Sequence, residues 1–466
     1  MVDYLIKIIS RMLIRRSKKQ QIESQLRNLA LWDLDINDSG HIAIDGLDAI
    51  DLKEEYGSPL LIVNKKRLEK DAKNIQQAFA LAPSGSKVLY SYKTNCIPGI
   101  LKEIHNFGIG AEVISPYELW LAERLNVPGN MIVYNGVNKT EESIIQAIGM
   151  NIISINIDNA EEVDRVYRIA KKMDKKAHVG IRLGLVSGSQ FGLEIKSGEA
   201  LEVCKHIHEL SDYLDLNCVH FNVTSNARTA SIHKSCAVTA LRFMATIKSE
   251  MGLDISYLDI GGGFGVPTTK NMSHIEYGLY RTFGSLPKPP SFINFQPIDF
   301  FLGETITEIR QFCKKFNLKM PKLLIEPGRF VTSMSELLLA EVQTIKKKVD
   351  GTQFAITDAG RLSIAFPCEF EYHEVFIANR PKAEMDTLYH VMGRICTSAD
   401  WMFKNRYLPE LRPGDILAIM DAGAYFSSYS SNFAFQRPGL VMVCDGQSKI
   451  LRKHESFDHL VAMDVV

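Results

Sequence analysis

The sequence has no excess of charge of either sign, because 54 basic residues balance 54 acidic ones. Such a balance provides no broad electrostatic field for nucleic acid or an anionic membrane. No apolar run reaches the ~20 residues that a membrane helix requires, and no internal repeat or low-complexity tract is present. The eight cysteines form no C-x-x-C pair or regular framework, which is typical of reduced thiols in the cytoplasm.

Two kinds of ligand site are also missing from the sequence. No group of His, Asp, Glu or Cys has the spacing of a metal site, so we expect no bound metal. The glycine-rich segment 261–265 lacks the G-x-G-x-x-G spacing of a dinucleotide site. With 46% hydrophobic and 23% charged residues, the 466-residue chain can form two or three domains with sizeable cores.

The first 29 residues form a basic N-terminal extension. Residues 4–22 alternate apolar and basic positions, a pattern typical of a basic amphipathic helix that binds a membrane surface or a partner. A solvated or disordered extension is the simpler interpretation, and we prefer it. A cleaved secretory signal is not expected, because basic residues interrupt every apolar segment: Lys7, Arg11, Arg15 and Arg16.

From residue 58 onwards, short apolar runs alternate with amphipathic stretches. The runs predict strands and the stretches predict helices. The predicted strands are SPLLIVN (58–64), KVLYSYK (87–93), GAEVIS (110–115), MIVYNG (131–136), ISINID (153–158), HVGIRLG (178–184), NCVHFNV (217–223), SYLDIGGG (256–263) and KLLIEPG (322–328). Successive parallel βα units of this kind predict an α/β fold with a closed (β/α)8 barrel of the TIM type over residues 58–332.

The pattern changes after residue 332, where strand-like runs are separated by turn sequences without intervening helices. It predicts a C-terminal β-domain, a β-sandwich or a barrel-like sheet, over residues 333–466. Residues 30–57 are expected to supply one or more early strands to this domain. Residues 266–300, rich in Pro, Ser and Asn, are expected to form an insertion loop beside the barrel mouth.

Three chemically suggestive sequences fall at the ends of predicted barrel strands, where catalytic groups of such barrels lie. Lys93 ends VLYSYK, and a lysine at a buried strand end can become a nucleophile that forms a Schiff base. The glycines of 261–265 let backbone N–H groups converge on a phosphate. Glu326 can hold a protonated ring nitrogen, while Gly328 and Arg329 offer donors to an anion. Taken singly, each sequence also suits a purely structural role, such as a tight turn or a surface ion pair.

Together and in this order, these sequences resemble those of the pyridoxal-phosphate-dependent decarboxylases of the alanine-racemase fold type, which include diaminopimelate, ornithine and arginine decarboxylases. The likeness extends over residues 58–445. It rests on YSYKTN (90–95), GAEVISPYEL (110–119), IRLG (181–184), SQFGL (189–193), LDIGGGFG (258–265), IEPGRFV (325–331), TDAG (357–360), GRICTSAD (393–400) and DAGAY (421–425). The resemblance implies pyridoxal 5'-phosphate as cofactor, decarboxylation of a small amino acid, and a cytoplasmic homodimer with shared active sites.

The resemblance also implies roles for individual residues. Lys93 is similar to the lysine that binds the cofactor as a Schiff base. Cys396 is similar to the cysteine that reaches the site from the partner subunit and protonates the quinonoid carbon. Glu326 resembles the acid that keeps the pyridine nitrogen protonated, which favours a decarboxylase over a racemase. The other implied cofactor-binding residues are Arg182, Asn222, Ser225, Gly262, Gly263, Pro327, Gly328, Arg329 and Tyr425, and the implied substrate-binding residues are Arg329, Asp358, Thr397, Asp400 and Tyr425.

Three positions depart from the family pattern. Asn222 stands where the family usually has a histidine stacked on the cofactor ring. Thr397 follows the cysteine where the familiar decarboxylases have an acid that binds the distal amine of the substrate. Phe366 and Phe370 replace the arginine and tyrosine with which diaminopimelate decarboxylases hold the distal carboxylate.

These departures predict a substrate other than diaminopimelate. A neutral hydroxyl forgoes roughly 1.5–3 kcal/mol relative to a charge-assisted hydrogen bond. An amino acid with a neutral far end, or one tethered to a carrier as an amide or thioester, fits such a pocket. Asp358 and Asp400 remain as acids for a distal amine, so a diamine-type substrate stays open.

Two alternative functions stay open at this point. One is an amino-acid racemase or epimerase that uses the same cofactor. The other is a catalytically silent regulatory relative, an idea prompted by Asn222, although Lys93, Glu326 and Cys396 are all retained.

Overall fold

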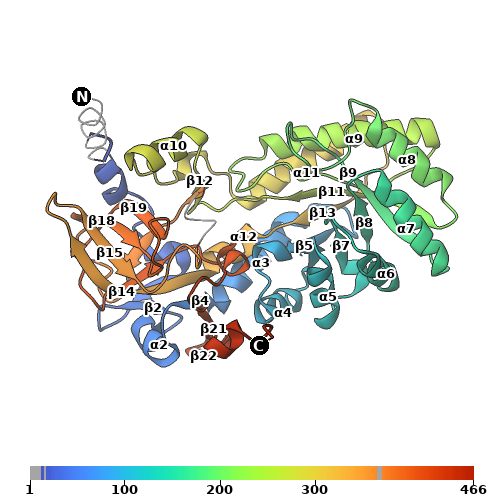
Figure 1. Cartoon of the computed structure of the whole chain (residues 1–466). Helices are drawn as coiled ribbons and strands as arrows, with labels where there is room; N and C mark the ends of the chain where they lie inside the picture. Colours follow the sequence, from blue (N-terminus) through green and yellow to red (C-terminus); the bar gives the residue numbers. More distant parts are fainter. Residues whose placement is uncertain (1–11, 15–16, 365–369, 466) are drawn as a thin grey trace. The chain divides into compact units, whose positions relative to one another are not determined.

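The structure is a computed structural model that describes residues 12–14, 17–364 and 370–465. The chain divides into two compact units (Figure 1). The barrel unit comprises residues 70–265 and 294–331. The β-domain unit comprises the residues up to 69 together with 266–293 and 332–466. Both units are therefore assembled from segments that are distant in the sequence.

Eight strands form the barrel: β5 (Lys87–Ser91), β6 (Gly110–Val113), β7 (Ile132–Tyr134), β8 (Ser154–Ile157), β9 (Ala177–Arg182), β10 (Leu214–His220), β11 (Tyr257–Gly262) and β13 (Lys322–Glu326). They close in the order β10-β11-β13-β5-β6-β7-β8-β9, and every pair is parallel. The predicted (β/α)8 barrel is confirmed. Parallel pairing places the carboxyl ends of all eight strands at one end of the barrel, where a site is built.

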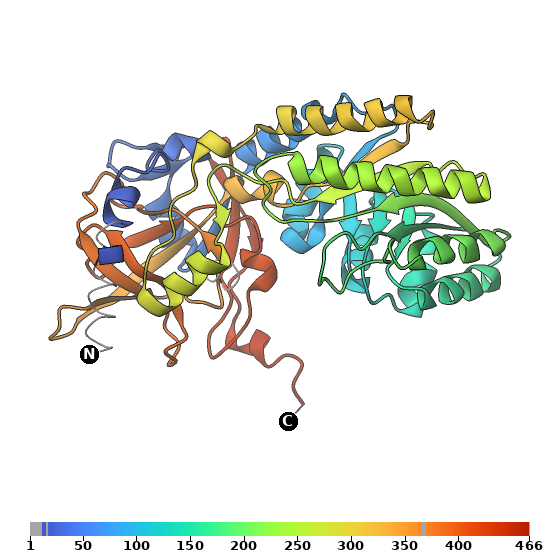
Figure 2. The ribbon, with the colours of Figure 1, turned by 90° about the horizontal axis from the view of Figure 1, so that it is seen from above.

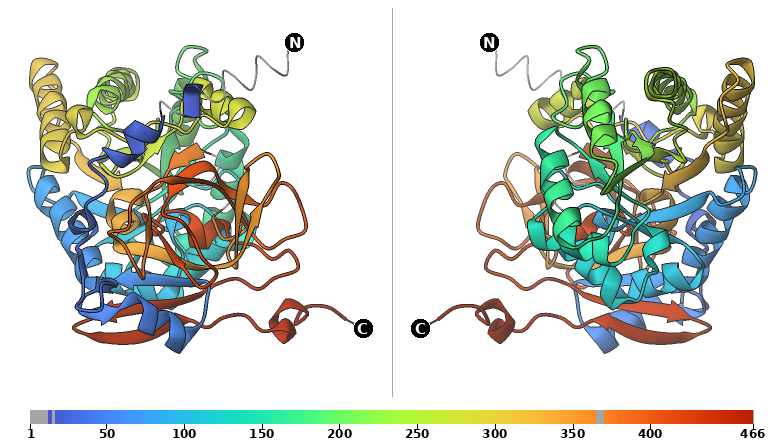
Figure 3. Two further views of the ribbon diagram at one scale, coloured as in Figure 1. Left: turned by 90° about the vertical axis from the view of Figure 1, so that its left-hand side faces the viewer. Right: turned by 90° about the vertical axis from the view of Figure 1, so that its right-hand side faces the viewer.

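Amphipathic helices follow most of these strands: α4 (Pro98–Asn106), α5 (Pro116–Arg124), α6 (Glu141–Gly149), α7 (Glu161–Lys172), α8 (Glu199–Glu209), α9 (Ser231–Met251) and α11 (Ile298–Lys315). In α7 the buried residues recur at helical spacing, at Val163, Val166 and Ile169. Its first turn is acidic and its last turn basic, which complements the helix dipole. Helices α9 and α11 pack side by side (Figure 2), and α6 to α8, teal to green, lie outside the strands (Figure 3, right).

The predicted strand at 58–64 does not belong to the barrel. It forms β4 (Leu60–Asn64), which pairs antiparallel with β14 (Glu336–Lys347) and parallel with β21 (Gly439–Cys444) in the β-domain unit. The prediction that the barrel begins at residue 58 is therefore wrong. All five residues of β4 are buried, and such an apolar run suits a barrel strand and a central sheet strand equally well.

The predicted C-terminal β-domain is confirmed as a nine-stranded sheet. Its members are β4, β14 and β21 with β15 (Gln353–Thr357), β17 (Val375–Ile377), β18 (Thr387–Met392), β19 (Trp401–Leu408), β20 (Ile416–Ile419) and β22 (Gln447–Arg452). Residues 34–48 add a separate three-stranded sheet, whose Ile42 and Ile44 pack into the same core as Leu60 and Phe376. The strands curl around this core (Figure 3, left).

The N-terminal extension is packed rather than solvated from residue 17 onwards. Residues 17–22 are helical, and Ser17 and Gln21 are buried. The Nη1 of Arg27 donates to Glu374 Oε1 at 3.1 Å. Our preferred interpretation of a solvated extension is wrong for this part. Among the described residues, no helix is both long and apolar enough to cross a membrane.

The insertion at 266–300 is likewise structured. It contains β12 (Lys270–Asn271) and α10 (His274–Phe283), and β12 pairs with β16 (Glu371–Tyr372). The backbone N–H of Lys404 donates to the hydroxyl of Tyr280 at 2.8 Å, which fixes α10 against β19. The prediction of a plain loop is therefore wrong.

Candidate active site

Lys93 lies just beyond the carboxyl end of β5 and contacts a buried carboxylate. Its side chain is one-third exposed, and its Nζ lies 3.3 Å from Glu112 Oε2 on the neighbouring strand β6. Ser91, which is in register with Glu112, donates its hydroxyl to the same oxygen at 2.5 Å. The lysine that sequence reasoning singled out is thus held at the mouth of the barrel, with part of its surface accessible.

Glu326, at the end of β13, is buried beside His220 and Asp259. Its Oε1 lies 3.6 Å from His220 Nε2. Burial raises the pKa of Glu326, but the charges of His220 and Lys93 outweigh burial and bring it to about 2. Burial and the neighbouring Glu326 raise the pKa of Asp259 well above its usual value. Glu326 is therefore the ionised acid of this pair and suits a protonated ring nitrogen.

The sequence predicted no metal site, but His220, Asp259 and Glu326 lie close enough together to be compared with one. His220, Asp259 and Glu326 each offer a ligand atom, and these atoms lie within 4.8 Å of one another. The sequence spacing of these residues did not indicate the cluster, because they belong to three different strands. Because Asp259 keeps its proton, the group offers one carboxylate charge, which is less than a hard divalent ion prefers.

The side-chain amide of Asn135 forms hydrogen bonds with both carboxylates, Glu112 and Glu326. Asn135, directly after β7, donates from Nδ2 to Glu112 Oε1 at 3.1 Å and to Glu326 Oε1 at 2.5 Å. All three side chains are buried. A continuous set of contacts therefore links Lys93 to Glu326.

The glycine-rich turn after β11 packs too closely for any side chain. A Cβ on Gly262 would lie 2.2 Å from the carbonyl oxygen of Glu326, and a Cβ on Gly263 would lie 2.1 Å from that of Thr224. Gly263 also has a φ of +79°, a left-handed conformation that glycine adopts without strain. A Cβ on Gly328 would similarly meet Thr94 Oγ1 at 2.0 Å. Gly262 and Gly328 are buried and Gly263 is half-buried. Turns of adjacent glycines can bring backbone N–H groups together on a phosphate.

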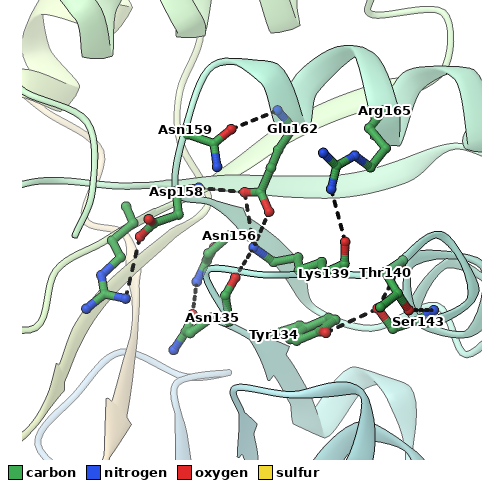
Figure 4. Close-up of polar contacts among 12 residues, drawn as sticks. Tyr134, Asn135, Lys139, Thr140, Ser143, Asn156, Asp158, Asn159, Glu162 and Arg165 are labelled. Carbon is green, nitrogen blue, oxygen red and sulfur yellow. Dashed lines mark hydrogen bonds and ion pairs between the residues drawn. The ribbon is translucent and has the colours of Figure 1, made fainter. Parts of the chain in front are cut away.

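Arg182 is positioned by a buried charge network at the ends of β8 and β9. Its Nη1 lies 3.6 Å from Asp158 Oδ1, and its guanidinium lies 4.5 Å from the centroid of the Phe191 ring. Glu162 accepts the backbone N–H of Asp158 at 2.8 Å and pairs with the fully buried Lys139 at 3.1 Å (Figure 4). Burial lowers the pKa of Lys139, although Glu162 and Asp158 oppose this.

The loop after β10 carries two further predicted cofactor-binding residues, Asn222 at the ring face and Ser225 near the phosphate. Asn222 is half-buried, and within the described part of the chain its Oδ1 has no hydrogen-bond partner. Ser225 is exposed. The Nδ1 of His220 is also buried without a partner among the described residues. Unsatisfied polar atoms of this kind are expected where a polar ligand belongs.

The segment after β13 is held against β5. The carbonyl oxygen of Pro327 accepts the backbone N–H of Ser91 at 3.1 Å. Arg329 is buried at the start of α12 (Arg329–Thr332). Both residues therefore follow β13, the strand next to β5, at the same end of the barrel as Lys93.

The cysteine loop lies in the β-domain unit, between β18 and β19. Cys396 and Thr397 are exposed. Asp400 is 1% exposed, and its two carboxylate oxygens accept the backbone N–H groups of Arg361 at 2.7 Å and Ile395 at 2.8 Å. These bonds give Asp400 a role in holding the loop, so the prediction that it binds a distal amine is not supported.

The other predicted residues of the β-domain unit differ in exposure. Asp358 is buried and accepts the backbone N–H of Glu341 at 2.8 Å, and burial raises the pKa of Asp358. It lines a cavity of about 530 Å³ together with Arg394. Tyr425 is half-buried, has a φ of +73°, and directly precedes α14 (Phe426–Tyr429). Phe366 lies outside the described residues.

The residues of the barrel unit fit pyridoxal 5'-phosphate. They provide a partly exposed lysine after β5, an ionised acid at the end of the neighbouring strand β13, glycine turns without room for a Cβ, and unsatisfied polar atoms on His220 and Asn222. Sequence reasoning missed several members: Glu112, Asn135, Asp259 and His233. A polar residue within or directly after an apolar barrel strand was the available signal for the first three.

Comparisons with known proteins agree with this geometry. A family model described as pyridoxal-dependent decarboxylase, pyridoxal binding domain, matches residues 65–333. The chain is 29% identical to the diaminopimelate decarboxylase of Methanocaldococcus jannaschii over 446 residues, which cover 92% of this chain and 95% of that protein. It is 27% identical to the diaminopimelate decarboxylase of Methanothermobacter thermautotrophicus over 441 residues, covering 92% of this chain and 96% of that protein.

Solved structures show the same likeness. The crystal structure of the M. jannaschii diaminopimelate decarboxylase superimposes with a TM-score of 0.83 at 28% identity and covers 94% of this chain and 99% of that one. A co-complex of the M. jannaschii enzyme with L-lysine superimposes with a TM-score of 0.82 at 28% identity, covering 93% of this chain and 98% of that one.

Proposed function

The chain belongs to the pyridoxal-dependent decarboxylases, and we propose that it decarboxylates an amino acid whose far end differs from that of diaminopimelate. Its cofactor is pyridoxal 5'-phosphate and its reaction is that of a carboxy-lyase acting on an amino acid. The single observation that carries the proposal is that the exposed residue after Cys396 is Thr397, at the position where the resemblance implies an acid.

The residues of the barrel unit divide the work of holding the cofactor. Bound pyridoxal 5'-phosphate supplies a ring that accepts the electron pair left when carbon dioxide departs. Lys93 Nζ holds the cofactor covalently, and the ionised Glu326 holds a proton on its ring nitrogen. We assign the phosphate to the backbone N–H groups of Gly262, Gly263 and Gly328, as the resemblance implies, because adjacent glycines can bring such groups together on an anion.

Further residues act on the cofactor's surroundings. Pro327 and Arg329 follow β13, next to Glu326, and Arg182 ends β9, where its side chain is held by Asp158. Asn222 and Ser225 belong to the loop after β10, and Tyr425 is assigned to the phosphate or the substrate by the resemblance. An amide at residue 222 leaves the ring face without an imidazole, so its electronic effect on the ring is smaller.

Proton return to the substrate carbon is assigned to the thiol of Cys396. The thiol is exposed at the tip of a loop that Asp400 holds in shape. We place this thiol in the site of a second copy of the chain, so that the active unit is a homodimer with two shared sites. Exposure of the cysteine and threonine side chains on one loop supports this arrangement.

The far end of the substrate meets Thr397 instead of a carboxylate. A hydroxyl does not neutralise a distal ammonium, which disfavours diaminopimelate by roughly 1.5–3 kcal/mol for the lost charge-assisted bond. Phe370 stands in place of a tyrosine and has no hydroxyl to offer the substrate. Its ring stacks on Tyr277 of α10 with a centroid distance of 6.0 Å. A neutral far end, or one joined to a carrier as an amide or thioester, suits these residues. The relatives named diaminopimelate decarboxylases are similar in sequence and fold, and the proposal rests on these two departures from the family pattern that the resemblance implies.

The proposal is tested by carbon dioxide release. The cofactor-loaded protein is incubated with a panel of free L- and D-amino acids, meso-diaminopimelate, and amide or thioester derivatives. Release from a member with an uncharged far end supports the proposal. Efficient release from diaminopimelate, lysine or ornithine removes its support, and proton exchange at Cα without carbon dioxide release would indicate a racemase instead.

A further inference from the structure

A chain of hydrogen bonds crosses the barrel interior from β8 to the two carboxylates of the site. The hydroxyl of Ser154 donates to Asn156 Oδ1 at 2.8 Å, and Asn156 Nδ2 donates to Asn135 Oδ1 at 2.6 Å. Asn135 Nδ2 then donates to Glu112 Oε1 at 3.1 Å and Glu326 Oε1 at 2.5 Å. Every one of these five side chains is buried.

The direction of this chain of bonds is fixed by its members. Asn156 turns its N–H group toward Asn135, so Asn135 must turn its oxygen toward Asn156 and its two N–H hydrogens toward the carboxylates. The neighbouring strand leaves room for the Asn156 amide because residue 180 is glycine: a Cβ there would lie 2.1 Å from Asn156 Oδ1. The amide of Asn135 is therefore held in one orientation.

We propose that Asn135 is a positioning residue that keeps Glu112 and Glu326 ionised at the same time by donating one hydrogen to each. Two buried carboxylates that face each other without a donor between them share a proton. An asparagine is suited to this position because it carries two N–H hydrogens and no charge.

Asp259 belongs to the same cluster, and the side-chain bonds of Asn135 described above go to the other two carboxylates, Glu112 and Glu326. It is fully buried, and Oδ1 accepts one backbone N–H, from Gly261 at 3.0 Å. Its Oδ2 has no partner among the described residues. Burial and the charge of Glu326 raise the pKa of Asp259 well above its usual value. Beside it, despite burial, the charges of His220 and Lys93 lower the pKa of Glu326 to about 2, and Glu326 also accepts the Asn135 hydrogen.

The consequence rests on the proposed function. An ionised Glu112 stabilises the charged form of Lys93, while an ionised Glu326 holds the proton of the cofactor's ring nitrogen. Both requirements are met together only if the two carboxylates do not compete for one proton. The titratable groups that face this pair are Lys93, Glu118, Cys218, His220 and Asp259.

The test uses the protein without cofactor and compares wild type with Asn135→Leu, which has a similar volume but no donor. Denaturant unfolding is measured from pH 5 to pH 8. We expect the folded variant to bind one proton more than wild type, so its folding equilibrium constant relative to wild type falls about tenfold per pH unit as the pH rises. A merely structural loss lowers stability equally at every pH, and an equal pH slope in the two proteins would overturn the proposal.

A second pair of variants tests whether the extra proton is bound by Glu112 and Glu326. In a Glu112→Gln background one carboxylate is gone, so the further change Asn135→Leu should leave the pH slope unchanged. A slope that persists in this background places the proton elsewhere and contradicts the proposal. Asn135→Val is measured in the same way if the leucine variant does not fold. Because no cofactor or substrate is present, failure here is distinct from failure of the proposed reaction.

Discussion

The imidazole of His233 is bonded to the backbone of Gly262: its Nε2 lies 2.9 Å from the carbonyl oxygen of that glycine. His233 belongs to α9 and is fully buried, and its ring stacks on Phe264 at a centroid distance of 5.4 Å. The bond connects a helix outside the barrel to the glycine turn that we propose as the cradle of the cofactor phosphate. Burial lowers the pKa of His233 more than this bond raises it, so the imidazole is neutral and donates from Nε2.

His233→Leu should weaken cofactor binding. The variant leaves a buried carbonyl without its donor, which costs about 1–3 kcal/mol and loosens the glycine turn. We expect a dissociation constant for pyridoxal 5'-phosphate at least about fivefold higher, measured by absorbance titration of the apoprotein. His233→Gln retains an N–H donor and serves as the control. Equal affinity in the leucine variant and wild type would show that the bond does not shape the turn.

The same histidine should make the protein sensitive to acid. An unfolded histidine binds a proton near pH 6.5, whereas the buried His233 does so only at lower pH. Its contribution to stability is therefore present above pH 6.5 and is lost as the pH falls below it. Between pH 6.5 and 5, wild type should lose up to about 1.4 kcal/mol of unfolding free energy per pH unit more than His233→Gln. Parallel curves in urea unfolding would contradict this assignment.

Lys93→Ala should abolish the absorbance of covalently bound cofactor in the purified protein, because no other amine of the site replaces Nζ. Lys87→Ala, at the opposite end of the same strand β5, is the control and should keep the absorbance. Retention of the absorbance in the Lys93 variant would show that another residue binds the cofactor.

Residues at the strand ends were predictable from the sequence where the signal is local. Lys93 and Glu326 directly follow or end apolar strands, and a barrel places such residues at one rim. The strand at 60–64 was misassigned, because its fully buried run suits a barrel and a sheet alike. Its partners, β14 and β21, are more than 270 residues away in the sequence, and only tertiary pairing selects them.

The network inside the barrel was not predictable. Asn135 contacts Glu112 and Glu326, which are 23 and 191 residues away in the sequence. Each of these side chains is separately compatible with an exposed strand end. Their joint burial, which makes the hydrogen bonds obligatory, follows from closure of the barrel and not from any local pattern.

Mixing two inactive variants should restore activity if the site is shared. Lys93→Ala and Cys396→Ala chains, combined in equal amounts and allowed to exchange, would produce mixed dimers with one intact site. About a quarter of all sites should then be active in the statistical limit. Carbon dioxide release is measured before and after mixing. No recovery, with exchange demonstrated, would place the cysteine and the lysine of each site on one chain.

The central claim, that the far end of the substrate is not that of diaminopimelate, is tested most directly by one comparison of kcat/KM. The cofactor-loaded protein is assayed for carbon dioxide release from meso-diaminopimelate and from the analogue whose far carboxylate and amine are replaced by a neutral amide. We expect the neutral analogue to be preferred by about tenfold or more, corresponding to the roughly 1.5–3 kcal/mol of a charge-assisted hydrogen bond that Thr397 does not provide. A kcat/KM that is higher for diaminopimelate would contradict the account.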